Sequence, residues 1–444
     1  MRLRKPFIAV AVVSSMVLAA CGSSNDTATT TGDTTATTSA SVPDTTVPTA
    51  DTGATTTTAY VPPARGDADL VIWADDTRAP VLQPIAQAFA DAEGIKVVVQ
   101  EVPFDKIRDN LITAGPAGEG PDIIIGAHDW LGELVKNGVV EPIDLGTAAS
   151  QYADVAVQAF TYDGKVYGLP YAIENIALIR NTDLVPEAPA TWEDLETVAL
   201  QLKADGKVDI PLAIQQGPAD PYHNFPLYSL TGADVFAQNA DGTYDPQQLG
   251  LDSPEALASA DNFKKWSDEG LISKDVTYDI MIESFSSGKA PFAITGPWMT
   301  SDKDRGPGAK GINYVVEPIP PLAGGAPAHV FVGVQGFMIS SFSASKDLAK
   351  TFLLDYAGTE DVQMQLFDAG GRPPAMTSAF DKVKTDADVA GFGLAGQAGQ
   401  PQPAIPEMSA VWDTWKDAYN LIFTGNDPQQ AFKDAAATIR GKIS

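Results

Sequence analysis

The chain has 444 residues, of which 44% are hydrophobic and 19% charged, with a formal net charge of -28 and one cysteine. This length predicts two domains, and the acidic balance excludes nucleic acid as a partner because phosphate binding needs a basic face. A single cysteine excludes an intrachain disulfide and a cysteine-cluster metal site.

Residues 1–20 have the pattern of a secretory signal peptide. Three basic residues precede an apolar run, residues 7–20, that is too short to span a bilayer. The run ends at Leu18-Ala19-Ala20-Cys21-Gly22, which resembles the bacterial lipobox. The resemblance implies that Cys21 is acylated and holds the protein on the extracytoplasmic face of the cell membrane. The alternative is an ordinary signal peptide with an incidental cysteine.

Residues 21–66 lack the apolar side chains of a core. They are nearly all Thr, Ala, Ser, Asp, Gly, Val and Pro, a composition typical of a disordered, lipid-anchored tether. A flexible coil of about 45 residues spans roughly 35–40 Å on average. The folded part is therefore expected to start at residue 67 and to stay near the membrane without lying on it.

Strand and helix patterns alternate from Leu70 onward. Apolar runs predict strands at 70–73, 95–102 and 122–125, and helical spacing predicts helices from Val81 through Ile85, Ala88 and Phe89, over 104–114 and over 132–137. This alternation indicates a parallel, doubly wound α/β sheet. The first and third strands end in polar clusters, and ligands bind at such strand ends in open α/β sheets.

A second extended run, residues 166–179, carries Glu174 midway. A carboxylate there is costly to bury unless it is paired, so Glu174 is a candidate site residue; the alternative is a charge on an exposed edge. Thr191 is a helix N-cap signal. Beyond 190, the pattern predicts strands at 210–214, 290–294 and 330–339, a loop at 215–225, and helices at 192–204, 254–269, 281–288, 346–356, 359–367, 408–423 and 428–441.

Several segments together resemble the maltose/maltodextrin-binding proteins, which are solute-binding components of sugar ABC transporters. The matching segments occur in the family's order from about residue 68 to the end: Leu70-Val71-Ile72-Trp73, Gly120-Pro121-Asp122-Ile123-Ile124, Ala127-His128-Asp129, Leu169-Pro170-Tyr171-Ala172-Ile173-Glu174, Asn181-Thr182-Asp183-Leu184, Thr191-Trp192-Glu193, Gly296-Pro297-Trp298, Phe331-Val332-Gly333-Val334 and Ile405-Pro406-Glu407-Met408 through Trp412.

The resemblance implies an α/β, two-lobe periplasmic-binding-protein fold, with a doubly wound sheet in each lobe. Residues 67–172 and 335–384 would form lobe I, and residues 173–334 and 385–444 lobe II. It also implies a monomer without a cofactor or a metal, which captures a maltose- or maltodextrin-like oligosaccharide between its lobes. Hinge bending would close the lobes, and the permease subunits of an ABC importer would accept the closed form.

The positions that match the family's binding residues divide by chemistry. Sugar hydroxyls favour charged and bidentate hydrogen-bonding groups, and the apolar faces of pyranose rings favour aromatic walls. The resemblance assigns the polar role to Asp76, Thr77, Arg78, Asp129, Glu174, Asp220 and Lys416, and the aromatic role to Trp130, Tyr222, Trp298 and Trp412. The alternatives are core tryptophans and solvated surface charges.

Four positions depart from the family's pattern. Gly126 stands where the family has an aromatic residue, Trp130 and Lys416 stand where it has arginines, and Arg78 replaces a lysine. An additional tryptophan, Trp415, lies beside Lys416. These changes leave an α-glucoside ligand in agreement with the pattern and leave the preferred sugar open.

Three other interpretations compete with sugar binding. A glycosidase would pair Asp129 with Glu174, but no spacing requires it. A metal site would use His128, His223 and His329, which have no ligand spacing, and His128 is expected to be a hydrogen-bonded structural residue. The stronger alternative is a cationic solute such as a polyamine, bound by the acidic residues and tryptophans. Arg78 and Lys416 favour a sugar instead.

Overall fold

The computed structural model describes residues 60–239 and 243–444. The chain divides into two units, Met1–Thr58 and Ala59–Ser444, and the description below concerns the second. The predicted signal peptide, Cys21 and most of the predicted tether lie outside the described residues. None of the helices in residues 60–239 and 243–444 combines the length and the apolar content that a transmembrane span requires.

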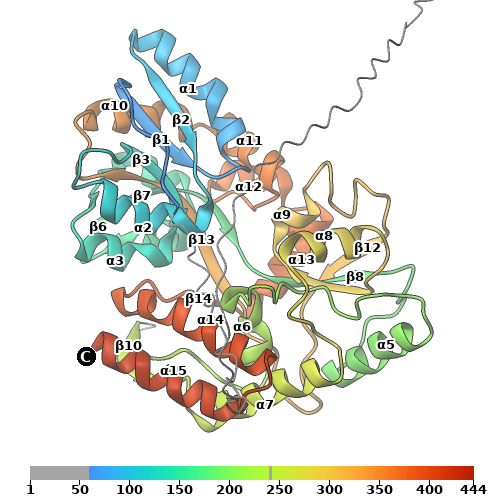
Figure 1. The fold of residues 1–444 in the computed structure, drawn as a ribbon. Coiled ribbons are helices and arrows are strands. Elements are labelled where there is room, and N and C mark those ends of the chain that lie inside the picture. The colour runs from blue at the N-terminus through green and yellow to red at the C-terminus, as the bar shows by residue number, and fades with distance from the viewer. Residues whose placement is uncertain (1–59, 240–242) are drawn as a thin grey trace, which may run out of the picture. The chain divides into compact units, whose positions relative to one another are not determined.

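A seven-stranded mixed sheet contains the first strands of this unit (Figure 1). Its members are β1 (Leu70–Ala74), β2 (Val97–Glu101), β3 (Ile123–Ala127), β4 (Val140–Glu141), β7 (Gly168–Glu174), β13 (Phe331–Ser340) and β14 (Gln400–Pro401). β1 pairs in parallel with β2 and β3, and β14 with β13. β13 runs antiparallel to β3, β4 and β7, so a strand from late in the chain completes the sheet that the first residues begin.

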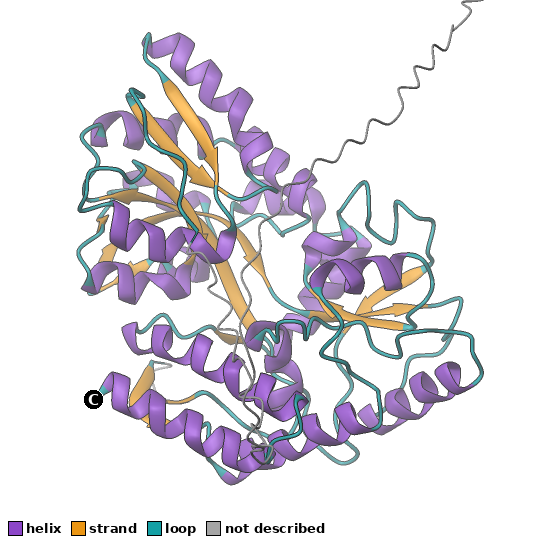
Figure 2. Cartoon of the chain, viewed as in Figure 1, coloured by secondary structure: helices purple, strands orange, loops and turns teal. Residues whose placement is uncertain are grey.

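Helices flank these strands (Figure 2). They are α1 (Ala79–Glu93), α2 (Phe104–Ala114), α3 (Leu131–Lys136), α4 (Asp154–Ala159), α10 (Lys346–Thr351), which continues as a π-helix over Phe352–Ala357, α11 (Glu360–Gly370) and α12 (Thr377–Val383). A short hairpin of β5 (Thr161–Tyr162) and β6 (Lys165–Val166) follows α4. In α1, Leu82, Ile85 and Phe89 are buried, because their spacing places them on one face.

A smaller antiparallel sheet has the order β11 (Phe292–Thr295), β8 (Ala177–Asn181), β12 (Tyr314–Glu317). A separate hairpin pairs β9 (Phe236–Gln238) with β10 (Tyr244–Leu249). The accompanying helices are α5 (Trp192–Ala204), α6 (Pro221–Ser229), α7 (Pro254–Asp268), α8 (Tyr278–Ser286), α9 (Pro297–Thr300), α13 (Ala387–Ala395), α14 (Ser409–Phe423) and α15 (Pro428–Ile443).

The buried apolar residues form three clusters. The first combines members from residues 68–172 with members from residues 334–379. The second and third combine members from residues 176–331 with members from residues 392–439. Each cluster thus unites segments that are far apart in the sequence, and the two groups of clusters share no segment of the chain.

The α/β class is confirmed, but several details of the prediction are wrong. The sheets are mixed or antiparallel rather than parallel throughout, because β13 returns through the larger sheet and β8 lies between two antiparallel neighbours. Residues 210–214 form only an isolated bridge, Ala213 to Ala293, and the predicted loop at 215–225 contains the start of α6. Ala88 is exposed, because the buried face of α1 passes through Ala86 instead.

Residues 60–66, which the sequence assigns to the tether, contact the fold. Tyr60 packs against the first core cluster, and the Arg65 guanidinium donates to the Gly120 carbonyl at 3.0 Å and pairs with the Asp122 carboxylate at 2.6 Å. Asp122 is fully buried and also accepts the Val71 amide at 2.7 Å. Residues 60–66 are therefore part of the folded unit.

Candidate ligand-binding site

Glu174 ends β7, beside β13, and it lies at the centre of a cluster of polar groups. Its residue is only 5% exposed. One carboxylate oxygen accepts from Gln335 Nε2 at 2.8 Å, and the other accepts from Arg372 Nε at 2.5 Å. The cost of burying this charge is offset by an opposite charge and two donors. The interpretation of Glu174 as a charge on an exposed edge is wrong.

Arg372 connects Glu174 to the first of the tryptophans. Its Cζ lies 4.8 Å from the ring centroid of Trp298, a cation–π distance. Trp298 belongs to α9, directly after β11 of the smaller sheet. Arg372 is held by Glu174, at the end of β7 in the larger sheet, so the contact joins residues next to the two sheets. Arg372, which lies between α11 and α12, is not among the predicted site residues. Its setting, Gly370-Gly371-Arg372-Pro373-Pro374, is the one sequence signal of a rigidly held loop cation.

Arg78 directly precedes α1, and its guanidinium is buried in a layered arrangement. Its Cζ lies 5.2 Å from the ring centroid of Phe104 and 5.5 Å from that of Tyr171. Nε hydrogen-bonds to the Tyr171 hydroxyl, and Nη1 pairs with Asp75. Nη2 has no partner among the described residues. The guanidinium is thus fixed in place with one nitrogen unused.

Asp129 lies in the 3₁₀ turn His128–Trp130 that follows β3, and it is 6% exposed. Burial raises the pKa of its carboxyl group to about 7, against the lowering effects of Arg108 and of a hydrogen bond from Trp412. Oδ1 has no partner among the described residues. Since Trp412 belongs to α14, this turn and the C-terminal helices meet at the carboxylate.

The raised pKa of Asp129 predicts a pH-dependent stability. Because the folded chain binds this proton more tightly than the unfolded chain, the free energy of unfolding contributed by Asp129 falls as the pH rises from about 4 to 7. Between pH 5 and 8, the wild-type chain should lose about 2 kcal/mol relative to an Asp129→Asn variant. Urea unfolding of both chains across this range measures the difference, and a difference independent of pH would contradict the assignment.

Tyr222, in α6, adds an aromatic wall with an unused hydroxyl. Its ring stacks on Phe331 with centroids 6.5 Å apart, and Phe331 in turn meets Trp412 edge to face at 6.2 Å. Burial, followed by the charge of Glu174, raises the pKa of the Tyr222 hydroxyl well above its usual value. The hydroxyl has no partner in the described part of the chain.

Three of the predicted polar residues are exposed to solvent or already paired with other protein groups. Asp76 is exposed. Lys416 pairs with Asp413 on the same helix, and Trp415 is a core residue. The carboxylate of Asp220 caps α6, accepting the Tyr222 amide at 2.9 Å, and pairs with His223 at 2.5 Å.

Thr77 and Trp130 present little free polar or aromatic surface. Thr77 is half-buried, and its amide donates to Asp75 Oδ1 at 3.2 Å. Trp130 is 7% exposed and packs on Phe104, with ring centroids 4.8 Å apart. Both residues therefore contribute more to the framework of the cluster than to its free surface.

Each of the three histidines has its own protein partner. His128 Nδ1 accepts the Val334 amide at 3.1 Å, so Nε2 carries the proton that it donates to the Gln402 carbonyl, also at 3.1 Å. The predicted structural role of His128 is confirmed. His223 pairs with Asp220 and His329 with Asp234. The three form no metal-ligand group, and no group of three His, Cys, Asp or Glu side chains suited to a metal ion occurs within residues 60–239 and 243–444.

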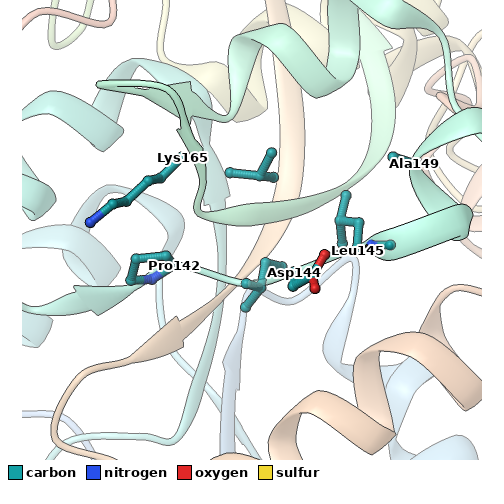
Figure 3. A pocket seen from close by; sticks show the side chains of 8 residues that line it. Pro142, Asp144, Leu145, Ala149 and Lys165 are labelled. Atoms are coloured by element: carbon teal, nitrogen blue, oxygen red, sulfur yellow. Dashed lines mark hydrogen bonds between the residues drawn. The ribbon is translucent and has the colours of Figure 1, made fainter.

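An open hollow of about 410 Å³ lies elsewhere, between residues 142–149 and β6 (Figure 3). Pro142, Leu145 and Ala149 line it, together with Asp144 and Lys165. The Asp144 carboxylate already accepts the Gly146 amide at 2.8 Å. None of the predicted ligand-binding residues lines the hollow, and its few polar groups converge on no point, so the polar cluster around Glu174 is the better candidate site.

Four buried polar atoms of this cluster have no hydrogen-bond partner among the described residues: Arg78 Nη2, Asp129 Oδ1, Tyr222 OH and Gln335 Oε1. Buried polar atoms in proteins are mostly paired; eight further unpaired ones lie among the described residues outside this cluster. Donors and acceptors are both represented, and the partly exposed rings of Tyr222, Trp298 and Trp412 accompany them. The cluster is suited to a ligand that has many hydroxyl groups and apolar ring faces.

The two-lobe α/β fold and this cluster define a solute-binding protein. The chain belongs to the family of bacterial extracellular solute-binding proteins, whose model matches residues 84–393. The relatives are binding proteins rather than enzymes, which confirms the binding interpretation over the glycosidase one.

Three known proteins illustrate the similarity. A galactooligosaccharide-binding protein of Bacillus subtilis is 28% identical, over 85% of this chain and 90% of its own. A maltooligosaccharide ABC transporter solute-binding lipoprotein of Streptococcus pneumoniae is also 28% identical, over 84% of this chain and 89% of its own. The solved structure of a Thermus thermophilus maltotriose-binding protein bound with maltotriose matches with a TM-score of 0.76 and 31% identity, over 84% of this chain and 100% of its own.

Proposed function

We propose that the chain is an extracytoplasmic, lipid-anchored solute-binding protein that captures an oligosaccharide between two lobes and delivers it to the permease subunits of an ABC importer. The observation that carries this proposal is the set of unpaired buried polar atoms beside partly exposed aromatic rings around Glu174. Hydroxyl groups can both donate and accept, so one carbohydrate could satisfy Arg78, Asp129, Tyr222 and Gln335 together.

The division into lobes is part of the proposal. Lobe I comprises residues 67–172 and 335–384, and lobe II comprises residues 173–334 and 385–444. The separation of the core clusters supports these boundaries, since no cluster takes members from both groups of segments apart from Val334 at a boundary. Glu174 lies at the first of these boundaries, and His128 of lobe I hydrogen-bonds to Val334 and Gln402 of lobe II. A ligand would favour closure by binding the closed form more tightly.

A maltose- or maltodextrin-like α-glucoside is the ligand class that we favour. The relatives bind maltooligosaccharides or galactooligosaccharides according to their names, so the choice between glucosides and galactosides is part of the test. A cationic solute is disfavoured because Arg78 and Arg372 both lie at the cluster, where they repel an amine.

Calorimetric titration of the purified chain tests the ligand class. Maltose, maltotriose, a galactooligosaccharide and spermidine would be titrated separately. We expect saturable binding of at least one oligosaccharide and none of spermidine. Binding of spermidine without any sugar would show that the acidic groups define the site and would overturn the proposal.

Lipid anchoring predicts a second outcome. Cys21→Ser should move the protein from the membrane fraction to the soluble fraction, because the acyl chains supply the membrane affinity. The streptococcal relative's name as a lipoprotein supports this expectation. Immunoblots of fractionated cells measure it, with Ser24→Ala as the matched control that should stay in the membrane fraction. Unchanged membrane retention of the Cys21→Ser variant would contradict lipidation.

A further inference from the structure

Two glycines at strand ends lie directly against two of the site's indoles. A Cβ atom added at Gly126, in β3, would stand 2.2 Å from Cζ3 and 2.4 Å from Cε3 of Trp130. A Cβ atom added at Gly296, directly after β11, would stand 2.2 Å from both Cη2 and Cζ3 of Trp298. Each contact is on the six-membered ring, and each is far shorter than van der Waals contact allows.

The backbone itself does not require glycine at these positions. Gly296 has φ -100° and ψ -178°, an extended conformation open to any residue, and neither glycine has a positive φ. The indole is therefore the reason that no side chain fits. The same arrangement occurs once beside the larger sheet and once beside the smaller one, although the two tryptophans follow their glycines by different numbers of residues.

The surroundings fix each indole from other directions as well. Trp130 packs on Phe104, whose ring also lies 5.2 Å from the Arg78 guanidinium. Trp298 lies under Arg372 and meets His223 edge to face, with centroids 6.0 Å apart. Each indole therefore contacts its glycine on one side and an aromatic or cationic partner as well.

We propose that Gly126 and Gly296 are positioning residues of the ligand site, which set how far each indole recedes toward its sheet and so determine the width available to a bound sugar ring. The inference rests on the proposed function. Gly296 with Trp298 would define the wall next to Arg372. Trp130 is 7% exposed, so Gly126 would act on the wall next to Asp129 by setting the position of this buried indole behind it. Alanine at either glycine would push its indole outward and narrow the site.

The displacement can be measured without a ligand. The full-length chain, solubilised in detergent and labelled with 5-fluorotryptophan, should show one ¹⁹F resonance for each of its seven tryptophans. Trp130→Phe and Trp298→Phe assign the two that matter. We expect Gly126→Ala to shift the Trp130 resonance and Gly296→Ala the Trp298 resonance. Gly393→Ala, on an exposed helical position with open space, is the matched control and should shift neither.

Binding of maltotriose then tests the consequence for the site. Gly296→Ala should weaken binding by at least tenfold in the wild-type background. In a chain carrying Trp298→Phe, whose shorter ring clears the clash, the same substitution should cost less than threefold, and the corresponding pair at Gly126 and Trp130 should behave alike. Such non-additivity is the mark of direct coupling between the two residues.

The outcomes separate the two claims. Unshifted resonances, or losses that simply multiply between Gly296→Ala and Trp298→Phe, would overturn the positioning role while leaving sugar binding intact. Failure of the wild-type chain to bind any oligosaccharide would overturn the proposed function and the ligand-site role with it, whatever the ¹⁹F shifts show. Thermal unfolding of each variant verifies that the chains compared are folded.

Discussion

Replacing Trp298 with alanine should weaken oligosaccharide binding about thirtyfold, or about 2 kcal/mol, as expected for a partly buried aromatic anchor. The ring is held by the Arg372 guanidinium and by the close approach of Gly296, so it is ordered before any ligand arrives. A rigid aromatic face loses little entropy on binding, and its removal also leaves Arg372 without its ring partner. Trp412→Ala, beside Asp129, should produce a loss of similar size.

Calorimetric titration of both variants with the sugar that the wild-type chain prefers gives the measurement. Phe342→Ala is a suitable control, since Phe342 is a large aromatic residue with 47% exposure and no place in the cluster. Its affinity should equal that of the wild-type chain. If Trp298→Ala and Trp412→Ala both bind as tightly as the control, the two tryptophans do not contact the ligand.

Replacing Asp122 with alanine should lower the free energy of unfolding by about 3 kcal/mol. This carboxylate directly precedes β3 and is fully buried. It accepts from the Val71 amide at 2.7 Å, from Arg65 at 2.6 Å and from the Ser343 hydroxyl at 2.6 Å. Its loss leaves the Val71 amide buried without a partner, while Arg65, whose side chain is 19% exposed, can turn to water. Arg65→Ala should therefore cost distinctly less.

Urea unfolding of the two variants measures both effects. Glu187→Ala, at an exposed acidic position, is the matched control and should lie within about 0.5 kcal/mol of the wild-type chain. An Asp122→Ala variant as stable as this control would show that the three donors find water in the native state. Equal losses for Asp122→Ala and Arg65→Ala would instead mean that the ion pair, rather than the Val71 amide, dominates.

Local patterns predicted the fold well where the signal lies within one segment. The helix 104–114 has the predicted bounds, and Thr191 forms the expected cap, with reciprocal bonds to Asp194. The start of α6 was not predicted although Asp220 and Pro221 are an N-cap and N1 pair. Pro226 lies inside this helix and eight of its nine residues are buried, so no amphipathic period marks it. The direction in which the strands pair could not be predicted from local patterns, since β13 pairs with β7, more than 150 residues earlier in the chain.

The candidate site was predictable only in part, and mostly through resemblance. Glu174 has a local signal, as a carboxylate in an apolar run. Arg372 and Gln335 have almost none, because each acquires its role from a partner distant in the sequence. Lys416 is the opposite case. The resemblance places it at a binding position of the family, but in the structure it pairs with Asp413 on its own helix.

His128 and Asp129 are adjacent, buried and perturbed in opposite directions. Burial lowers the pKa of His128 to about 4 and raises that of Asp129 to about 7. Between these values the folded chain holds both groups uncharged, with one proton on the carboxyl group. From about pH 4 to about pH 6.5 an unfolded chain also holds one proton, but on the imidazole, with the carboxylate charged. Because the folded and unfolded chains then bind the same number of protons at these two groups, the pair leaves the free energy of unfolding unchanged as the pH falls through this range. The two neighbours thus have opposite effects on the free energy of unfolding. In a chain without the Asp129 carboxyl group, the lowered pKa of His128 alone would make the free energy of unfolding fall as the pH falls.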